Sequence, residues 1–155
     1  MTSVKDLEPY AGNAEGLTAV LADISSTMPN PIVFKVVGYV VNAFENVTQG
    51  DVVFARASDG QVGRAIANDT LDKAIVAGIA ETTVTAGNQV RIIVTGQVAV
   101  STSIDPGDLY FLSASSAGSL TKTPPTTAGH YVTLVGEAGT SNQIVLKIKR
   151  PIQLR

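Results

Sequence analysis

The residues best able to do chemistry in this sequence are one histidine and a few carboxylates. His130 is the only histidine, and the chain has no cysteine. Nucleophilic hydrolysis needs a base beside the nucleophile and an acid that orients the base, and the sequence has no Gly-x-Ser-x-Gly turn. A zinc site needs three or four ligands at suitable spacing. We therefore expect no catalytic triad, no metal site and no cofactor, and we interpret His130 as a residue beside a strand.

The carboxylates of Asp105 and Asp108 flank Pro106-Gly107 and could form the pair that glycoside hydrolysis requires. Aspartates in such a sequence more often close a tight turn through their side chains, and we favour that interpretation. Glu81 and Glu137 are expected at strand ends with no partner. The sequence thus predicts no catalytic residue, and we expect that the protein is not an enzyme.

The composition favours β-structure. Val, Ile and Thr make up 47 of the 155 residues, and branched side chains fit a pleated surface. Charged residues are 15%, against about 25% in soluble domains. The net charge of −2 argues against a nucleic-acid partner. No apolar run reaches the roughly 18 residues that a membrane span needs.

The first 30 residues differ from the rest, and we interpret them as an N-terminal arm. Their charged residues are Lys5, Asp6, Glu8, Glu15 and Asp23, a net charge of −3. Four apolar residues spaced i, i+3, i+4 and i+7 predict a short amphipathic helix. They are Leu17, Val20, Leu21 and Ile24. Pro29-Asn30-Pro31 would stop that helix, and residues 31–155 are expected to form a β domain.

The first expected strand, residues 32–41, is apolar at nearly every position. A strand with one wet face alternates polar and apolar residues, so this strand should be covered on both faces. It could be a central strand packed against the arm, or it could lie in a subunit interface. Its candidate contact residues are Val33, Val37, Tyr39 and Val41.

Further strands are expected at regular spacing, separated by turns that contain Gly, Asp or Asn. Their ranges are 51–56, 60–65, 74–82, 89–95, 97–102, 109–113, 119–123, 131–139 and 143–149. Many short strands with such turns are typical of a small β-barrel or sandwich. The predicted fold class is therefore all-β, preceded by an extended N-terminal arm.

The β domain contains an internal echo between residues 50–95 and 107–149. Gly50-Asp51 matches Gly107-Asp108 at an offset of 57, and three further segments match in order at offsets of 58, 58 and 54. The sequence predicts a domain built from two similar β units, because neither half could bury its sheet alone. Chance similarity between hairpins is the alternative.

The C-terminal end is basic. Residues 147–155 hold Lys147, Lys149, Arg150 and Arg155 and no acid, a charge of +4. This segment could be a solvated tail, or it could align neighbouring chains by attracting the acidic arm. Residues 151–155 are apolar enough to dock as an edge strand, although Pro151 cannot donate to a ladder.

The pattern of residues 48–148 resembles tailed-phage virion proteins, in particular head-decoration and fibre modules. The likeness lies in turn and strand motifs. They include residues 50–54, 59–65, 75–80 and 86–96, and then the Tyr110-Phe111-Leu112-Ser113, Pro125-Thr126-Thr127-Ala128-Gly129 and Val135-Gly136 runs. The resemblance implies a small β protein on the capsid exterior, assembled in the host cytoplasm and often trimeric, that clamps neighbouring capsomers. Its partners would be the major capsid protein and other copies of itself.

Three functions remain open from the sequence. The first is a capsid cement or decoration protein, which needs contact area rather than an active site. The second is a fibre or spike module that binds a host glycan, for which the stacking residues would be Tyr10, Tyr39, Tyr110, Tyr131 and the phenylalanines. The third is an enzyme such as a glycan depolymerase. The lack of a catalytic constellation favours the first.

Overall fold

The computed structural model describes residues 35–155. The boundary expected at residue 30 and part of the expected contact set therefore lie outside the described residues. These contact residues are Leu17, Val20, Leu21, Ile24 and Val33.

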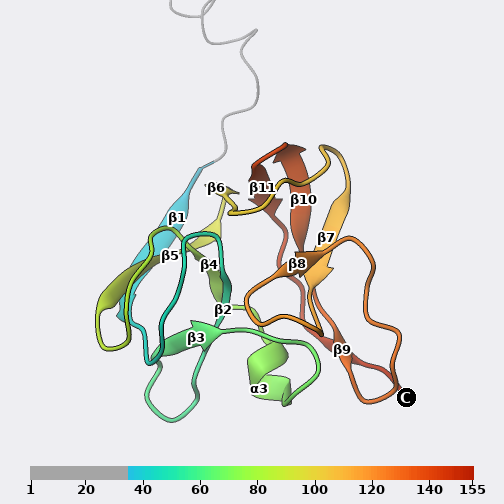
Figure 1. Cartoon of the computed structure of the whole chain (residues 1–155), viewed down its shortest axis with the longest axis horizontal. Helices are drawn as coiled ribbons and strands as arrows, with labels where there is room; N and C mark the ends of the chain where they lie inside the picture. Colours follow the sequence, from blue (N-terminus) through green and yellow to red (C-terminus); the bar gives the residue numbers. More distant parts are fainter. Residues whose placement is uncertain (1–34) are drawn as a thin grey trace, which may run out of the picture. The chain divides into compact units, whose positions relative to one another are not determined.

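The described residues form two antiparallel five-stranded sheets (Figure 1). The first sheet has the order β1-β5-β4-β2-β3 and consists of β1 (Val37–Asn42), β2 (Val52–Ala55), β3 (Val62–Arg64), β4 (Gly78–Ala80) and β5 (Gln89–Thr95). The second has the order β6-β11-β10-β7-β8 and consists of β6 (Gln97–Ala99), β7 (Leu109–Leu112), β8 (Leu120–Thr121), β10 (Leu134–Thr140) and β11 (Gln143–Leu146). The all-β prediction is confirmed, and the sheets do not close into a barrel.

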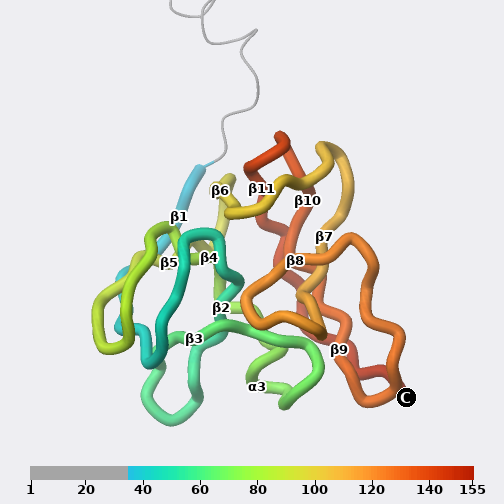
Figure 2. Tube along the Cα trace, viewed as in Figure 1, coloured from blue at the N-terminus to red at the C-terminus, as the bar shows by residue number. Residues whose placement is uncertain are grey.

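The two sheets repeat one topology, as the expectation of two similar β units requires. If β1 to β5 are matched with β6, β7, β8, β10 and β11 in chain order, the two strand orders become identical. The turns also repeat: the Gly50 amide donates to Ala80 O (2.9 Å) and the Gly107 amide to Ala138 O (2.7 Å). Figure 2 shows the chain completing the first unit before it begins the second.

The register corrects one of the expected sequence matches. Ala80 pairs with Ile92, and its counterpart Ala138 pairs with Ile144. Ile92 therefore corresponds to Ile144, an offset of 52 rather than the expected 54. A slip of two residues keeps every side chain on the same face, which explains why the sequence pattern did not reveal it.

One main apolar cluster lies between the sheets and takes residues from both. The first sheet contributes Val52, Phe54, Ile79 and Ile93, and the second contributes Val98, Tyr110, Leu112, Ala138 and Ile144. A smaller cluster covers the opposite face of the first sheet. It consists of Ala43, Val47, Val53, Val62, Ala80, Val90 and Ile92.

Hydrogen bonds tie the two units together beside this core. The buried hydroxyl of Thr133 donates to Ala74 O at 2.9 Å. The amide of Tyr131 donates to Ala67 O at 2.8 Å. Because an unpaired polar group in the core would cost about 1–3 kcal/mol, these bonds favour one way of packing the units.

The region between β3 and β4 differs from the expected strand over residues 74–82. A short helix, α3 (Leu71–Ala74), occupies its start, and β4 is confined to Gly78–Ala80. The Lys73 ammonium lies 2.6 Å from the Asp69 carboxylate, an i, i+4 pair that supports the helical turn. The expected strand is therefore wrong at its start and is confirmed only for residues 78–80.

The end of the chain also adds a strand pair. The expected strand 131–139 is divided into β9 (Tyr131–Val132) and β10, and β12 (Ile152–Gln153) pairs with β9. The C-terminal segment is therefore docked as an edge strand, one of the alternatives that its apolar residues suggested. Residues 152–153 are therefore held in a strand pair, although both remain exposed to solvent.

The repeated Gly78 and Gly136 mark places where two strands approach closely. A Cβ on Gly136 would collide with the carbonyl oxygen of Val145, and a Cβ on Gly78 would collide with that of Ile93. A Cβ on Gly139, in the same strand as Gly136, would have the flexible amide end of Gln97 as its nearest neighbour, at 3.2 Å.

We therefore expect Gly136→Ala to lower the free energy of unfolding by about 1–3 kcal/mol, the usual cost of overpacking. Gly139→Ala is the matched control in β10 and should cost less than about 1 kcal/mol. Denaturant unfolding of both variants measures the difference. Equal stability of the two variants would contradict the close approach at Gly136.

Candidate interaction surfaces

The Asp105 and Asp108 pair is a structural turn in which a lysine separates the carboxylates. The Lys122 ammonium lies 2.8 Å from Asp105 and 2.9 Å from Asp108, and these two carboxylates raise the pKa of Lys122. The amide of Asp108 donates to Asp105 O at 3.1 Å, which closes the turn. The ammonium group of Lys122 thus occupies the space between the two carboxylates, where a substrate would have to bind if they were a catalytic pair.

Glu81 and Glu137 do have partners, which corrects the expectation from sequence. Arg91 lies 3.1 Å from Glu81, and Lys147 lies 2.6 Å from Glu137. Each pair joins the two strands of a hairpin, which brings together residues ten apart in the sequence. These carboxylates are therefore held in cross-strand ion pairs.

His130 lies half-buried beside a hollow of about 330 Å³. Its backbone carbonyl accepts a hydrogen bond from the Leu154 amide at 2.8 Å. The hollow is lined by prolines, small residues and hydroxyl side chains, with no carboxylate to orient the imidazole. His130 thus stands beside β9, as expected, and nothing in this lining forms a triad.

The described part of the chain offers little else for catalysis. Among residues 35–155, no group of three or more His, Asp or Glu side chains could hold a metal ion. The same range contains no helix long and apolar enough to cross a membrane.

The aromatic residues give limited surface for sugar stacking. Tyr110 and Tyr131 are buried, and the Tyr110 hydroxyl accepts a hydrogen bond from the Asp105 amide at 2.8 Å. Phe44 packs edge-on against Phe54 and under the Arg56 guanidinium. Tyr39 is the one tyrosine within residues 35–155 that is exposed.

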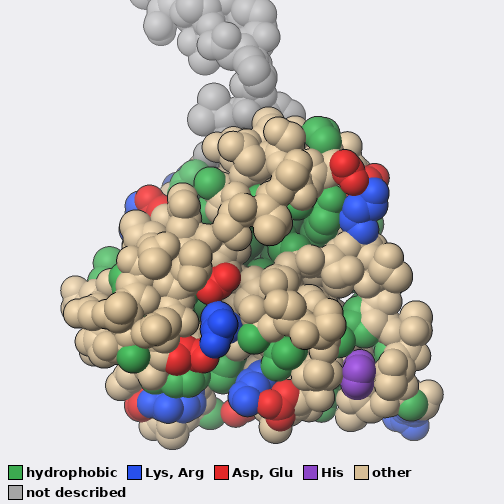
Figure 3. All heavy atoms as spheres, in the orientation of Figure 1, with side chains coloured by type: hydrophobic (Ala, Val, Ile, Leu, Met, Phe, Trp, Pro, Cys, Tyr) green, Lys and Arg blue, Asp and Glu red, His purple; other side chains and the backbone are tan. Residues whose placement is uncertain are grey.

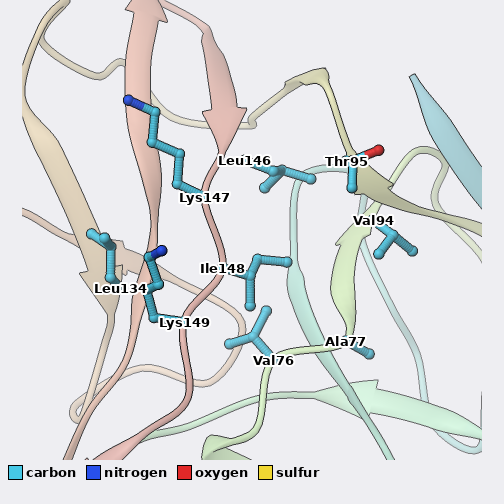
Figure 4. Close-up of a pocket in the computed structure, with 9 residues that line it drawn as sticks. All are labelled: Val76, Ala77, Val94, Thr95, Leu134, Leu146, Lys147, Ile148 and Lys149. Atoms are coloured by element: carbon cyan, nitrogen blue, oxygen red, sulfur yellow. The ribbon is translucent and has the colours of Figure 1, made fainter. Parts of the chain in front are cut away.

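A groove of about 500 Å³ opens between the two sheets (Figure 4). Val76 and Val94 line it from the first unit, and Leu134 and Ile148 line it from the second. Lys147 and Lys149 are also in the lining, but Lys147 is already paired with Glu137. The groove is apolar and contains no acid–base pair, so it has the character of a contact surface.

Among residues 35–155, the surface formed by β1 is apolar and exposed, and no strand pairs with its outer edge. β1 pairs with β5 and ends the first sheet, so the interpretation as a central strand is wrong, and the subunit-interface interpretation stays a prediction. Val37 is 45% exposed, Tyr39 41% and Val40 58%. Partial burial raises the pKa of Tyr39. Of the expected contact residues in β1, Val41 is half-buried against the smaller cluster. We call the exposed residues Val36, Val37, Tyr39 and Val40, which lie on both faces of this edge strand, the β1 surface.

The other sheet edges are shorter. β3 and β6 have three residues each, and β8 has two. Free edges template pairing with other chains, and proteins usually shorten or charge them. The six residues of β1 carry no charged side chain, although a register shift between Val37 and Gly38 interrupts the pairing of this strand with β5.

A second exposed apolar area lies on the outer face of the second sheet. Leu109 is 46% exposed, and Phe111, Leu134 and Val145 are half-buried on the same face. The Glu137–Lys147 ion pair also lies on this face. Sequence reasoning missed this surface, although the alternation of Leu109 and Phe111 with the buried Tyr110 and Leu112 was available as a signal. We call Leu109, Phe111, Leu134 and Val145 the second-sheet surface.

The charges on the described surface are few and mostly paired. Figure 3 shows one face on which uncharged polar groups predominate and most Lys and Arg side chains lie beside Asp or Glu. Asp51 is half-buried near Arg64, and burial is the main cause that raises its pKa. Local pairing leaves broad uncharged areas between the ion pairs.

The fold defines the class of this chain: an all-β protein of two similar five-stranded sheets. No protein-family model matches the sequence, and no curated protein is similar to it at a significant level. Among solved structures, the chain is similar to the head fibre gp8.5 N base of bacteriophage phi29. The TM-score is 0.45 and the sequence identity 19%, over 78% of this chain and 99% of that chain.

The exposure of β1 leads to a stability prediction. Val40→Lys should change the free energy of unfolding by less than about 0.5 kcal/mol, because surface changes are usually that small. Ile79→Lys places a charge at a residue with no exposure and should prevent folding. Circular dichroism during thermal unfolding compares the two, and a severe loss of stability in Val40→Lys would show that the described fold itself covers this strand.

Proposed function

We propose that this chain is a structural virion protein that binds the outer surface of a phage capsid and clamps neighbouring capsomers, without catalysis. The observation that carries the proposal is the apolar β1 surface beside an edge of β1 that no described strand pairs with; the six residues of β1 carry no charged side chain. An unpaired strand edge with exposed apolar side chains is suited to contact with another protein. The resemblance of residues 48–148 to phage decoration and fibre modules supplies the identity of that partner.

The chemistry of the described residues supports a contact role. The candidate carboxylates are occupied by lysine or arginine, and the groove between the sheets is apolar. A cement protein gains its effect from contact area repeated many times over a shell. Modest affinity per site is then sufficient, because every capsomer junction contributes.

The partners in this proposal are the major capsid protein and further copies of the chain, with a trimer as the expected assembly. The acidic arm, residues 1–30, would reach a neighbouring subunit, because a tethered second contact benefits from a high effective concentration. The apolar residues of the arm and the β1 surface are the proposed contacts. The place of action is the capsid exterior in the virion.

The glycan-binding alternative has less support. Sugar sites commonly stack rings on aromatic faces, and Tyr110 and Tyr131 are turned into the core. Tyr39 lies in the β1 surface, where an apolar protein contact fits its surroundings better.

Particles that lack the protein test the function directly. Virions assembled without it should lose infectivity or DNA at a lower temperature than complete virions, and faster in a chelator. Adding purified protein back should restore the original resistance and should be seen as bound density on the shell. Equal resistance with and without the protein, together with no binding to shells, would refute the proposal.

The arm can be tested separately by a paired substitution. Leu17→Asp with Leu21→Asp should weaken sedimentation with purified shells at least tenfold, because it places charges on the predicted apolar stripe. Thr18→Asp with Ala22→Asp is the matched control, since it adds the same charge on the other side of that predicted helix. Circular dichroism should show an intact β domain in both. Equal binding of the two double variants would exclude this role for the stripe.

A further inference from the structure

We propose that Gly96 is a hinge at which two copies of this chain exchange their second units. In the exchanged state, the first unit of each copy (residues 35–95) packs against the second unit (residues 97–155) of the other copy. The contact between the units is the one already present within a single chain, so no covered face has to become exposed. The inference goes beyond the proposed function, because it concerns copies of the chain alone and needs no capsid.

A single residue connects the two units. β5 ends at Thr95 and β6 begins at Gln97, so only Gly96 lies between them. All strands of the first sheet precede Gly96 in the chain, and all strands of the second sheet follow it (Figure 2). The units can therefore separate as whole bodies when the backbone changes at this one position. Short connections under strain favour exchange between copies.

Gly96 has a backbone conformation that favours glycine. Its φ is +101°, in the region that other L-residues rarely adopt. A Cβ at this position would lie 2.7 Å from the carbonyl oxygen of Lys35 and 2.8 Å from the Cα of Val36. These are backbone atoms, which cannot turn aside as the end of a flexible side chain can. The packing of both units within one chain thus depends on a glycine at position 96.

The strand before the hinge is bent as well. Val37 pairs with Thr95 and Gly38 pairs with Ile93, so β5 has one extra residue, Val94, in its pairing with β1. Such a β-bulge bends its strand and increases the local twist. The bulge and the left-handed glycine together redirect the chain from the first sheet to the second. An extended conformation at Gly96 would instead carry the second unit away from the first.

The contact between the units is strong enough to bring separated units together again. The main apolar cluster takes residues from both sheets, and burial of apolar area is the main driving force of folding and association. Backbone hydrogen bonds also cross the contact. They join Val52 N to Gly118 O (2.8 Å), Gly118 N to Ala65 O (2.7 Å), Ala67 N to Ser113 O (3.0 Å) and Tyr131 N to Ala67 O (2.8 Å).

The two units pack through faces that do not correspond, and this determines which units can pair. Ile79 of the first unit corresponds to Glu137 of the second, because each pairs with the strand that follows a Gly-Asp turn. Ile79 lies in the main cluster, whereas Glu137 lies outside it. Ile144 of the second unit lies in the main cluster, whereas its counterpart Ile92 lies in the smaller one. A first unit therefore accepts a second unit, and two copies satisfy both pairs by reciprocal exchange.

Exchange keeps the main cluster and these hydrogen bonds, and it relieves the constraint at Gly96. In the exchanged state the hinge joins units that are packed on different copies, so its φ can become negative. The cost is the loss of freedom when two copies associate, which matters less as the protein concentration rises. Glycine tolerates a positive φ, so the natural chain favours packing within one copy. Any other residue at position 96 shifts the balance towards exchange.

The test compares two valine variants of the full-length chain. Gly96→Val changes the hinge. Gly87→Val is the matched control, because Gly87 also has a positive φ (+90°) but lies in the turn between β4 and β5, where a Cβ would have open space. Each variant is unfolded in denaturant and refolded at low and at high protein concentration. Its mass is then measured by sedimentation after dilution to the same low concentration.

We expect Gly96→Val refolded at high concentration to form a dimer of about twice the chain mass of 16.0 kDa. The dimer yield should be at least about tenfold that of Gly87→Val, because exchange relieves the left-handed strain only at the hinge. Circular dichroism should show the same β-structure in both variants. Equal dimer yields would overturn the proposal. Failure of Gly96→Val to fold at either concentration would also overturn it, because exchange should relieve the strain.

Isotopically labelled chains show whether exchanged units or outer surfaces hold the dimer together. Labelled and unlabelled Gly96→Val should form mixed dimers, detected by native mass spectrometry, when they are refolded together. Finished dimers that are mixed afterwards should keep their partners, because the copies separate only when the main cluster opens. Rapid exchange of partners between finished dimers would identify an ordinary surface contact and would refute the hinge.

Two further variants test the direction of the effect. Gly96→Ala should also dimerise on refolding at high concentration, because alanine has the same conformational constraint as valine in milder form. Insertion of glycines after Gly96 should lower the dimer yield below that of the unmodified protein, because a longer hinge allows both units to pack within one chain. A higher dimer yield from the insertion variant than from Gly96→Ala would contradict the hinge at this position.

Discussion

The structure depends on burying the inner face of the first sheet. Ile79 and Ile93 lie at its centre with almost no exposure, and full burial of each contributes about 1.5–3 kcal/mol. The only described partner for this face is the second unit, whose Tyr110, Leu112 and Ile144 complete the same cluster. Once the units are packed in this way, the position of the groove and the hydrogen bond from Thr133 to Ala74 O both follow.

The same constraint explains the unusual surface of a chain that is only 15% charged. Two equivalent units that packed through equivalent faces would cover those faces completely. Here they pack through different faces. The other face of the first sheet is covered by the smaller cluster, whereas the outer face of the second sheet leaves Leu109 46% exposed. The counterpart of buried Ile79 has become Glu137, and Lys147 neutralises it. This exchange reduces the apolar character of the free face without removing Leu109 or Phe111.

Residue patterns in the sequence could predict the units but not their packing. β5 covers residues 89–95, as the alternation indicated, and the Gly-Asp turns recur where the echo placed them. The periodicity of a strand shows which of its residues share a face. Which face of the other sheet packs against them depends on contacts between residues far apart in the sequence. For this reason the continuous apolar run in β1 suggested cover on both faces, although the strand lies at a sheet edge.

The sequence also did not predict which side chains form ion pairs. Glu81 and Glu137 were expected to be unpaired because their partners lie ten residues away, and a hairpin brings them opposite only in one register. Beside helix α3, Lys73 pairs with Asp69 only four residues away.

The location of these ion pairs bears on how the protein recognises others. Most cations of the two units are satisfied by acids nearby in the same unit, so they contribute little long-range attraction. The β1 surface offers instead an apolar strip and an unpaired strand edge, whose hydrogen bonds are directional and fix the register of a partner strand. The second-sheet surface offers apolar side chains without a free edge along its centre. The two surfaces therefore differ in kind. Recognition by a strand edge depends on the shape and register of β-structure, the same features that hold the two units of each chain together.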